Sequence, residues 1–151
     1  MSRIDFYHLQ RQSLVEILPK LLQKVLSSDK RAFIKVGSSD EAEKLNTALW
    51  TYDEESFLPH GSKKEGFAAQ QPVWLDIADN NANGAEFLFL VNGAEIESDK
   101  INEFERVINI FDGKEEKALQ QARNLWIKYK EAGNEVHYWQ QTASGKWEQK
   151  M

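Results

Sequence analysis

The 151-residue sequence contains no cysteine and only three prolines. Without cysteine the chain has no disulfide framework, no thiolate metal ligand and no thiol nucleophile, a composition that is usual in a reducing cytosol. A chain of this length buries roughly 70% of its unfolded surface, so it does not need such cross-links to be stable. We therefore expect one domain spanning residues 1–151.

The sequence also lacks long apolar segments and an excess of basic residues. Its longest purely apolar run, Phe87–Val91, is much shorter than the roughly 20 residues that span a membrane. Residues 1–5 lead into a strand pattern and not into an export signal, so we expect a cytoplasmic protein without membrane contact. Because 24 acidic residues outnumber 19 basic ones, giving a net charge of -5, we expect any link to DNA to be indirect.

The first half of the chain alternates between strand and helix patterns. Residues 4–7 predict a strand, and the leucines and valine at 18–26 predict a helix with Pro19 in its first turn, where the missing N–H costs nothing. Residues 32–36 predict a second strand, after which Ser38 and Glu41 form a capping box that opens a helix extending to Leu49. This order predicts parallel strand pairing.

The second half continues the pattern. Residues 73–77 predict a strand, and the apolar run at 87–91 predicts a central strand covered on both faces. Residues 104–111 fit both helix and strand spacing, and we assign a strand because three of them are β-branched. Residues 135–147 predict a terminal hairpin. The sequence thus predicts a three-layer α/β/α fold with a mostly parallel open sheet.

Residues 114–132 give the strongest helix pattern of the chain. One stripe of this helix steps by four and three residues, which predicts a buried face, and Gly133 is a natural stop. The residues of the predicted buried stripe are Ala118, Ala122, Leu125, Tyr129 and Ala132.

Beside that stripe, the same helix carries a second row that mixes apolar and cationic side chains. The row consists of Leu119, Arg123, Trp126 and Lys130, again spaced by four, three and four. A guanidinium next to an aromatic shelf suits a peptide that ends in a bulky apolar residue and a free carboxylate. The alternative is an amphipathic boundary in which Arg123 extends over Trp126. The residues alone leave both interpretations open.

A second candidate site lies in residues 49–60, where large aromatics stand beside three carboxylates. Trp50 and Phe57, with neighbouring Leu58 and Pro59, are predicted to lie in a polar loop, where they indicate anchors for another molecule. The alternative is that Trp50 and Phe57 cap the core of the domain itself.

This segment resembles the ALW…ESF.PH signature of the chi subunit of bacterial DNA polymerase III, an accessory protein of the clamp loader. Further blocks in the order of that family are Ile4–Leu9, Pro72–Leu75, Phe87–Asn92 and Ala122–Gly133. The resemblance covers nearly the whole chain. It implies a chi-like fold and a non-catalytic adaptor within the replicative polymerase.

The resemblance also implies partners for both candidate sites. Chi-family proteins bind the acidic carboxyl-terminal tail of single-stranded DNA-binding protein, and Arg123 corresponds to an arginine of that site, with Trp126 at the matching aromatic position. The chain departs from the family at Leu119 and Ile127, where basic residues can flank this arginine. Lysines that are candidates to compensate are Lys117, Lys128 and Lys130.

Trp50, Phe57, Leu58 and Pro59 match the face through which chi proteins bind the psi subunit, which connects them to the clamp loader. The same surface also suits another partner, such as a helicase-like protein. The resemblance therefore implies a second interface whose occupant stays open.

Two enzyme interpretations remain as alternatives. Asp53, Ser56 and His60 have the residue types of a nucleophilic triad, and Asp53, Glu54, Glu55 and His60 those of a metal site. The sequence has no nucleophile elbow and no H-E-x-x-H pattern, so we expect neither catalysis nor a bound metal.

A nucleotide-binding enzyme is the other alternative. Gly37-Ser38-Ser39 stands at a strand-to-helix junction, the place where open α/β folds bind phosphate. The glycine fingerprint and the phosphate-loop lysine are both absent, and Ser38 is explained as a helix cap. We therefore expect no cofactor.

Overall fold

The computed structural model describes residues 3–9, 14–51, 61–62, 71–77, 81, 83–91, 93–96, 98–142, 144 and 146–150. Within these ranges the elements in chain order are β1 Arg3–Leu9, α1 Leu14–Ser27, β2 Ala32–Lys35, α2 Ser39–Thr51, β3 Gly61–Ser62, β4 Val73–Asp76, β5 Phe87–Leu90, the 3-10 helix η2 Ser98–Glu103, β6 Arg106–Asp112, α3 Glu116–Glu131, β7 Glu135–Gln141 and β8 Trp147–Gln149. Strand and helix alternate through most of this order.

The strands of the described residues form one eight-stranded sheet in the order β3-β4-β2-β5-β6-β1-β7-β8. Every neighbouring pair from β3 to β7 is parallel, and only β8 runs antiparallel, to β7. β5 lies near the centre, between β2 and β6, as its unbroken apolar run predicts. The mostly parallel open sheet predicted from the sequence is confirmed.

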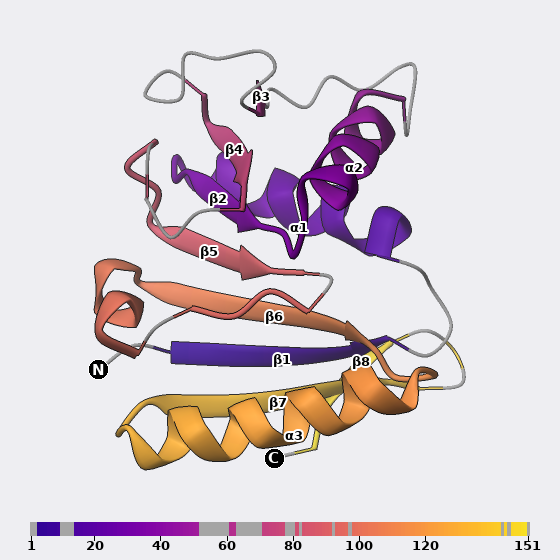
Figure 1. Ribbon diagram of the computed structural model, residues 1–151, viewed down its shortest axis with the longest axis vertical. Helices are drawn as coiled ribbons and strands as arrows, with labels where there is room; N and C mark the ends of the chain where they lie inside the picture. The colour runs from indigo at the N-terminus through magenta and orange to yellow at the C-terminus, as the bar shows by residue number, and fades with distance from the viewer. Residues whose placement is uncertain are drawn as a thin grey trace.

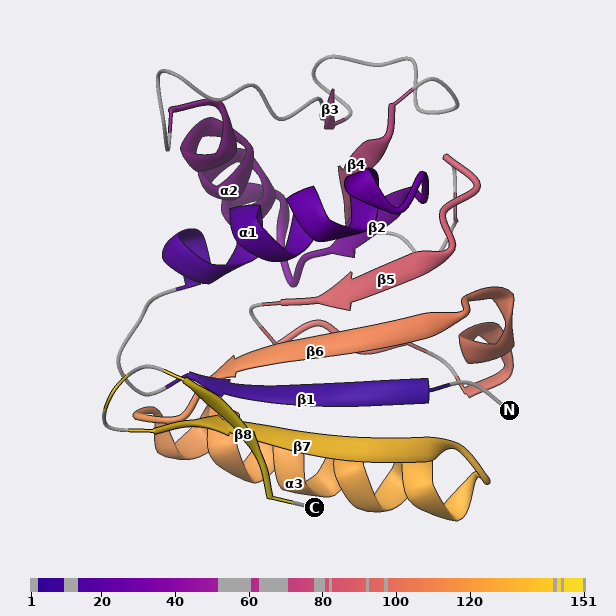
Figure 2. The same ribbon diagram turned by 180° about the vertical axis from the view of Figure 1, so that it is seen from behind.

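Helices cover both faces of the sheet. Figures 1 and 2 show α1 and α2 on one face, over the β2–β5 part, and α3 on the other, along β1 and β7. Two apolar clusters match these layers: one joins Leu18 and Leu22 of α1 to Phe89 of β5, and the other joins Leu125 and Tyr129 of α3 to the remaining face. The three-layer α/β/α arrangement is therefore confirmed.

The terminus of α3 confirms Gly133 as its stop. The Gly133 N–H donates to the Lys130 carbonyl at 3.1 Å and the Asn134 N–H donates to the Tyr129 carbonyl at 3.2 Å, the pair of bonds that closes a Schellman motif. Gly133 has φ +92°, which favours glycine. Ala132 is exposed, so its prediction as part of the buried stripe was wrong: it is the C-cap and lies past the last turn.

Two details at the starts of helices also bear on the predictions. Ser38 caps α2 as predicted, since its Oγ accepts from the Glu41 N–H at 3.3 Å. Pro19 does not lie in the first turn of its helix, because α1 begins at Leu14 and Pro19 is buried inside it. There it leaves the Val15 carbonyl without the usual N–H donor.

None of the described helices has the length and apolarity needed to span a membrane.

Candidate functional site

The second row on α3 forms a half-buried shelf with cations at its edges. Leu119 and Trp126 pack against the core cluster of the α3 layer, together with Tyr138 of β7, whereas Arg123 and Lys130 are exposed. The Trp126 ring lies 5.8 Å from the Phe6 ring and 6.0 Å from the Tyr138 ring, which it meets edge to face. These contacts fix the orientation of the indole while leaving part of it accessible.

The cation above the Trp126 ring is Lys130 and not Arg123. Lys130 Nζ lies 5.9 Å from the ring centroid, within the range of a cation–π interaction. Within the described residues Arg123 forms no ion pair. No carboxylate of the described residues therefore engages its guanidinium, and these contacts give no support to the alternative in which Arg123 extends over Trp126.

Beside Arg123 the structure places two residues that the sequence did not single out, His8 of β1 and Tyr138 of β7. His8 Nδ1 lies 2.5 Å from the Tyr138 hydroxyl oxygen, and the Phe111 ring packs against both rings, at 5.1 Å and 6.0 Å. Strand alternation is the signal that could have found His8, because it places His8 on the same face as Ile4 and Phe6. Their pairing depends on β1 and β7 being neighbours in the sheet.

Gly113 closes the other side of the imidazole. A Cβ atom at this position would lie 1.8 Å from His8 Nε2 and 2.8 Å from the Leu9 carbonyl oxygen, separations that real structures do not tolerate. The Gly113 N–H also donates to that carbonyl at 2.8 Å. The turn between β6 and α3 therefore holds His8 in place.

The positive charge of Arg123 reaches both members of this pair. Burial lowers the pKa of His8 from 6.5, Arg123 lowers it further, and Asp112 opposes the shift. Burial raises the pKa of Tyr138 above 10.0, against the effect of Arg123. At neutral pH the imidazole is thus uncharged and the phenol carries its proton. An anion that binds here would therefore find the charge of Arg123 and the protonated hydroxyl of Tyr138 beside the apolar shelf of Leu119 and Trp126.

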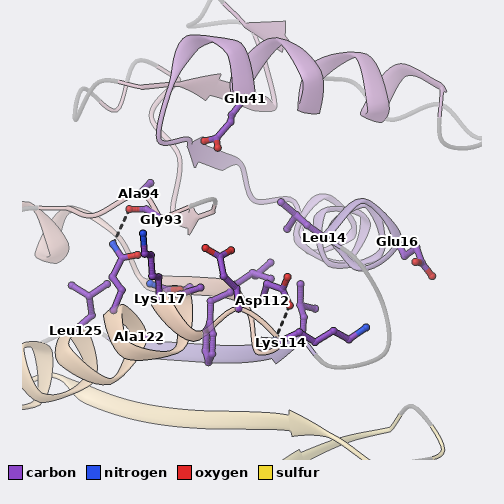
Figure 3. Close-up of a pocket in the computed structure, with 17 residues that line it drawn as sticks. Leu14, Glu16, Glu41, Gly93, Ala94, Asp112, Lys114, Lys117, Ala122 and Leu125 are labelled. Carbon is purple, nitrogen blue, oxygen red and sulfur yellow. Dashed lines mark hydrogen bonds between the residues drawn. The ribbon is translucent and has the colours of Figure 1, made fainter.

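A cavity of about 670 Å³ lies on the opposite flank of α3, next to Gln121 and Leu125. Figure 3 shows Glu41 on its α2 side and Lys117 on its α3 side. Because Lys117 lines this cavity, it does not lie in the row of Arg123. Four carboxylates line the cavity and two lysines oppose them; these residues are Glu16, Glu41, Asp112, Glu115, Lys114 and Lys117. Gly37, Ser38 and Ser39 are not among the lining residues, so this cavity does not bear on the nucleotide alternative.

The predicted partner face is described only in part. Trp50 lies in the last turn of α2 and not in a loop, which corrects the prediction, while Leu49 before it is buried in the core. The helix continues past Leu49 through Trp50 and Thr51, neither of which breaks a helix. The side chain of Trp50 lies outside the described part, and so do Phe57, Leu58 and Pro59.

The candidate catalytic and metal residues Asp53, Glu54, Glu55, Ser56 and His60 also lie outside the described residues. Among the residues that the structure does describe, no group of three or more His, Cys, Asp and Glu side chains is arranged to hold a metal ion.

Comparison with known proteins identifies the family of this chain. A curated protein of Rickettsia prowazekii (strain Madrid E), named "Probable DNA polymerase III subunit chi", is 27% identical over 155 residues, which cover 97% of this chain and 91% of the relative. The sequence model of the family described as "DNA polymerase III chi subunit, HolC" matches residues 1–137. Since this match extends over most of the chain, the protein belongs to the DNA polymerase III chi subunit family, the members of which are replication accessory subunits.

Proposed function

We propose that this protein is a non-catalytic replication adaptor that binds the acidic carboxyl-terminal tail of single-stranded DNA-binding protein and links it to the clamp loader of DNA polymerase III. The observation that carries the proposal is the pairing of an exposed Arg123 with the half-buried Trp126 on one flank of α3. Membership of the chi subunit family supports it.

The chemistry of the shelf suits the end of such a tail. The terminal carboxylate pairs with the Arg123 guanidinium, which offers two parallel N–H donors, and the last apolar side chain packs on Trp126 and Leu119. Lys130 stands two turns further along α3, about 10 Å away at 1.5 Å per residue. That separation equals about three residues of extended chain, so acidic residues upstream of the terminus reach the second cation.

The second interface of the adaptor is formed by Trp50, Phe57, Leu58 and Pro59, which bind psi or an equivalent clamp-loader partner. The end of α2, where Trp50 lies, is on the other face of the sheet from α3 (Figures 1 and 2). Two partners on opposite layers do not compete for one surface. A weak tail contact then suffices, because the link to the polymerase raises the effective concentration of the tail.

Calorimetric titration with an acidic peptide ending in Pro-Phe tests the tail site. We expect Arg123→Ala to weaken binding at least about tenfold, since a charge-assisted hydrogen bond is lost, and removal of the terminal Phe to do the same. Lys128→Ala is the matched control: Lys128 is exposed but lies about 140° round the helix from Arg123, so it does not join the row as the compensating lysine that the sequence suggested. Unchanged affinity of Arg123→Ala would overturn the proposal.

A further inference from the structure

We infer that Tyr138 and His8 complete the carboxylate site: the Tyr138 hydroxyl donates a hydrogen bond to the bound carboxylate, and His8 is the positioning residue that determines whether the hydroxyl is free to donate. This inference rests on the proposed peptide-binding function of the same shelf. It assigns two residues to the site that neither the α3 row nor the sequence signature contains.

Position favours Tyr138 as the contacting group. Tyr138 is partly exposed, and its ring makes a T-shaped contact with the ring of Trp126, the shelf on which the apolar end of the peptide would lie. His8 is only 8% exposed, so it acts through Tyr138. Phe111 and Gly113 enclose the imidazole, which keeps Nδ1 directed at the hydroxyl.

A single hydrogen atom lies between His8 Nδ1 and the Tyr138 oxygen. The atom that carries this hydrogen determines whether the hydroxyl can donate to the ligand. If Nδ1 is unprotonated, Tyr138 donates its hydrogen to His8 and presents only lone pairs, which a carboxylate cannot use. If Nδ1 carries the hydrogen, it donates to the Tyr138 oxygen and leaves the hydroxyl hydrogen for the ligand. A carboxylate therefore selects the states with an Nδ1–H, which are one neutral tautomer and the imidazolium.

Binding is thereby linked to protonation of His8. The charged or titratable groups that act on His8 from the packed elements are Arg123 of α3, Asp112 of β6 and Tyr138 of β7. A bound carboxylate offsets the charge of Arg123 and so raises the pKa of His8. The peptide should bind more tightly as the pH falls through the His8 titration. Peptide carboxylates have pKa values of about 3.5–4.3, so they stay ionised over most of this range.

The test combines calorimetry and NMR between pH 5.5 and 8 with the same Pro-Phe peptide. The native protein should bind more tightly at pH 5.5 than at pH 8, and the pKa of His8, followed through its imidazole resonances, should rise when the peptide saturates the site. Tyr138→Phe should bind about tenfold more weakly at pH 5.5 and show a smaller pH dependence than the native protein, because only the electrostatic effect of the carboxylate on His8 remains. His8→Asn, with an amide N–H in the place of Nδ1–H, should retain binding without pH dependence.

His137→Asn is the matched control, because His137 pairs with Gln149 and lies on the other face of β7 from Tyr138. It should keep the native pH profile. Circular dichroism and thermal midpoints of all variants establish that they are folded.

The inference is overturned if the pKa of His8 is the same with and without saturating peptide while Arg123 still governs binding, or if Tyr138→Phe binds like the native protein at every pH. If the native protein binds no peptide at any pH, the proposed function fails, and the inference fails with it.

Discussion

Arg106 of β6 donates from Nε to Asp5 Oδ2 of β1 at 2.5 Å, and the Asp5 side chain has no exposed surface. Asp5 Oδ1 also accepts from Trp139 Nε1 of β7 at 2.9 Å and from Arg3 at 3.2 Å. One carboxylate thus joins three adjacent strands. Two of these strands, β1 and β7, carry His8 and Tyr138 on their other face, so this network helps to set the geometry of the proposed site.

Asp5→Asn should lower the free energy of unfolding by about 3 kcal/mol, because breaking a buried ion pair leaves the remaining groups uncompensated. Urea denaturation measures the change. Glu148→Gln is the control: it removes an ion pair with Lys150 in which both side chains are about half exposed, and should cost no more than about 0.5 kcal/mol. Equal effects of the two substitutions would contradict a structural role for Asp5.

Gly113→Ala should destabilise the protein by about 2 kcal/mol through overpacking, because the new methyl group collides with His8 and the Leu9 carbonyl. It should also weaken peptide binding by displacing His8. Gly133→Ala is the comparison that introduces backbone strain without a steric clash: a Cβ atom there meets nothing within 4 Å, but the residue has φ +92°. It should lower the free energy of unfolding by about 1 kcal/mol and leave binding unchanged. A Gly113→Ala variant with native stability and affinity would show that His8 is not held by this turn.

The lowered pKa of His8 makes stability depend on pH in one direction. The pKa of His8 in the folded protein lies below 6.5, the ordinary value for histidine. As the pH falls through 6.5, the unfolded chain therefore binds a proton that the folded protein does not. The contribution of His8 is therefore fully present above 6.5 and decreases as the pH falls toward the folded pKa. Urea unfolding of the peptide-free protein at pH 7.5 and 5.5 measures this loss, which should be smaller in His8→Asn. An identical loss in both proteins would rule out His8 as its source.

Trp50→Ala and Phe57→Ala should release the clamp-loader partner, because truncated aromatic anchors cost interface energy of about 2 kcal/mol or more. Parallel pull-downs with psi and with the tail peptide are the measurement. The peptide should still bind, since α2 and α3 lie on opposite layers (Figure 1). Simultaneous loss of both partners from a folded variant would contradict two separate sites.

Much of the fold was predictable from local patterns. The apolar run at β5, the periodic stripe of α3 and the Gly133 stop each identified an element within a few residues of its observed bounds. The errors lie at boundaries. α1 begins at Leu14, since Leu14 and Ile17 extend toward the N-terminus the apolar spacing that was read from Leu18 onward, and this places Pro19 inside the helix; α2 extends to include Trp50. Side-chain spacing determines the terminal turns of a helix least, so the pattern does not fix the residue at which a helix begins or ends.

The amino-acid sequence by itself determined most of the segments that form strands and helices, that Leu119, Arg123, Trp126 and Lys130 share one flank of α3, and that the chain is similar to chi subunits. Hydrogen bonding within a segment and the periodicity of its side chains are local properties, so they can be read along the chain. Only the tertiary structure decided that His8 meets Tyr138, 130 residues away, and that Asp5 meets Arg106 and Trp139. Those contacts follow from the placement of β1 between β6 and β7. That order is set by long-range strand pairing and by burial on both faces of the sheet, which no local pattern encodes.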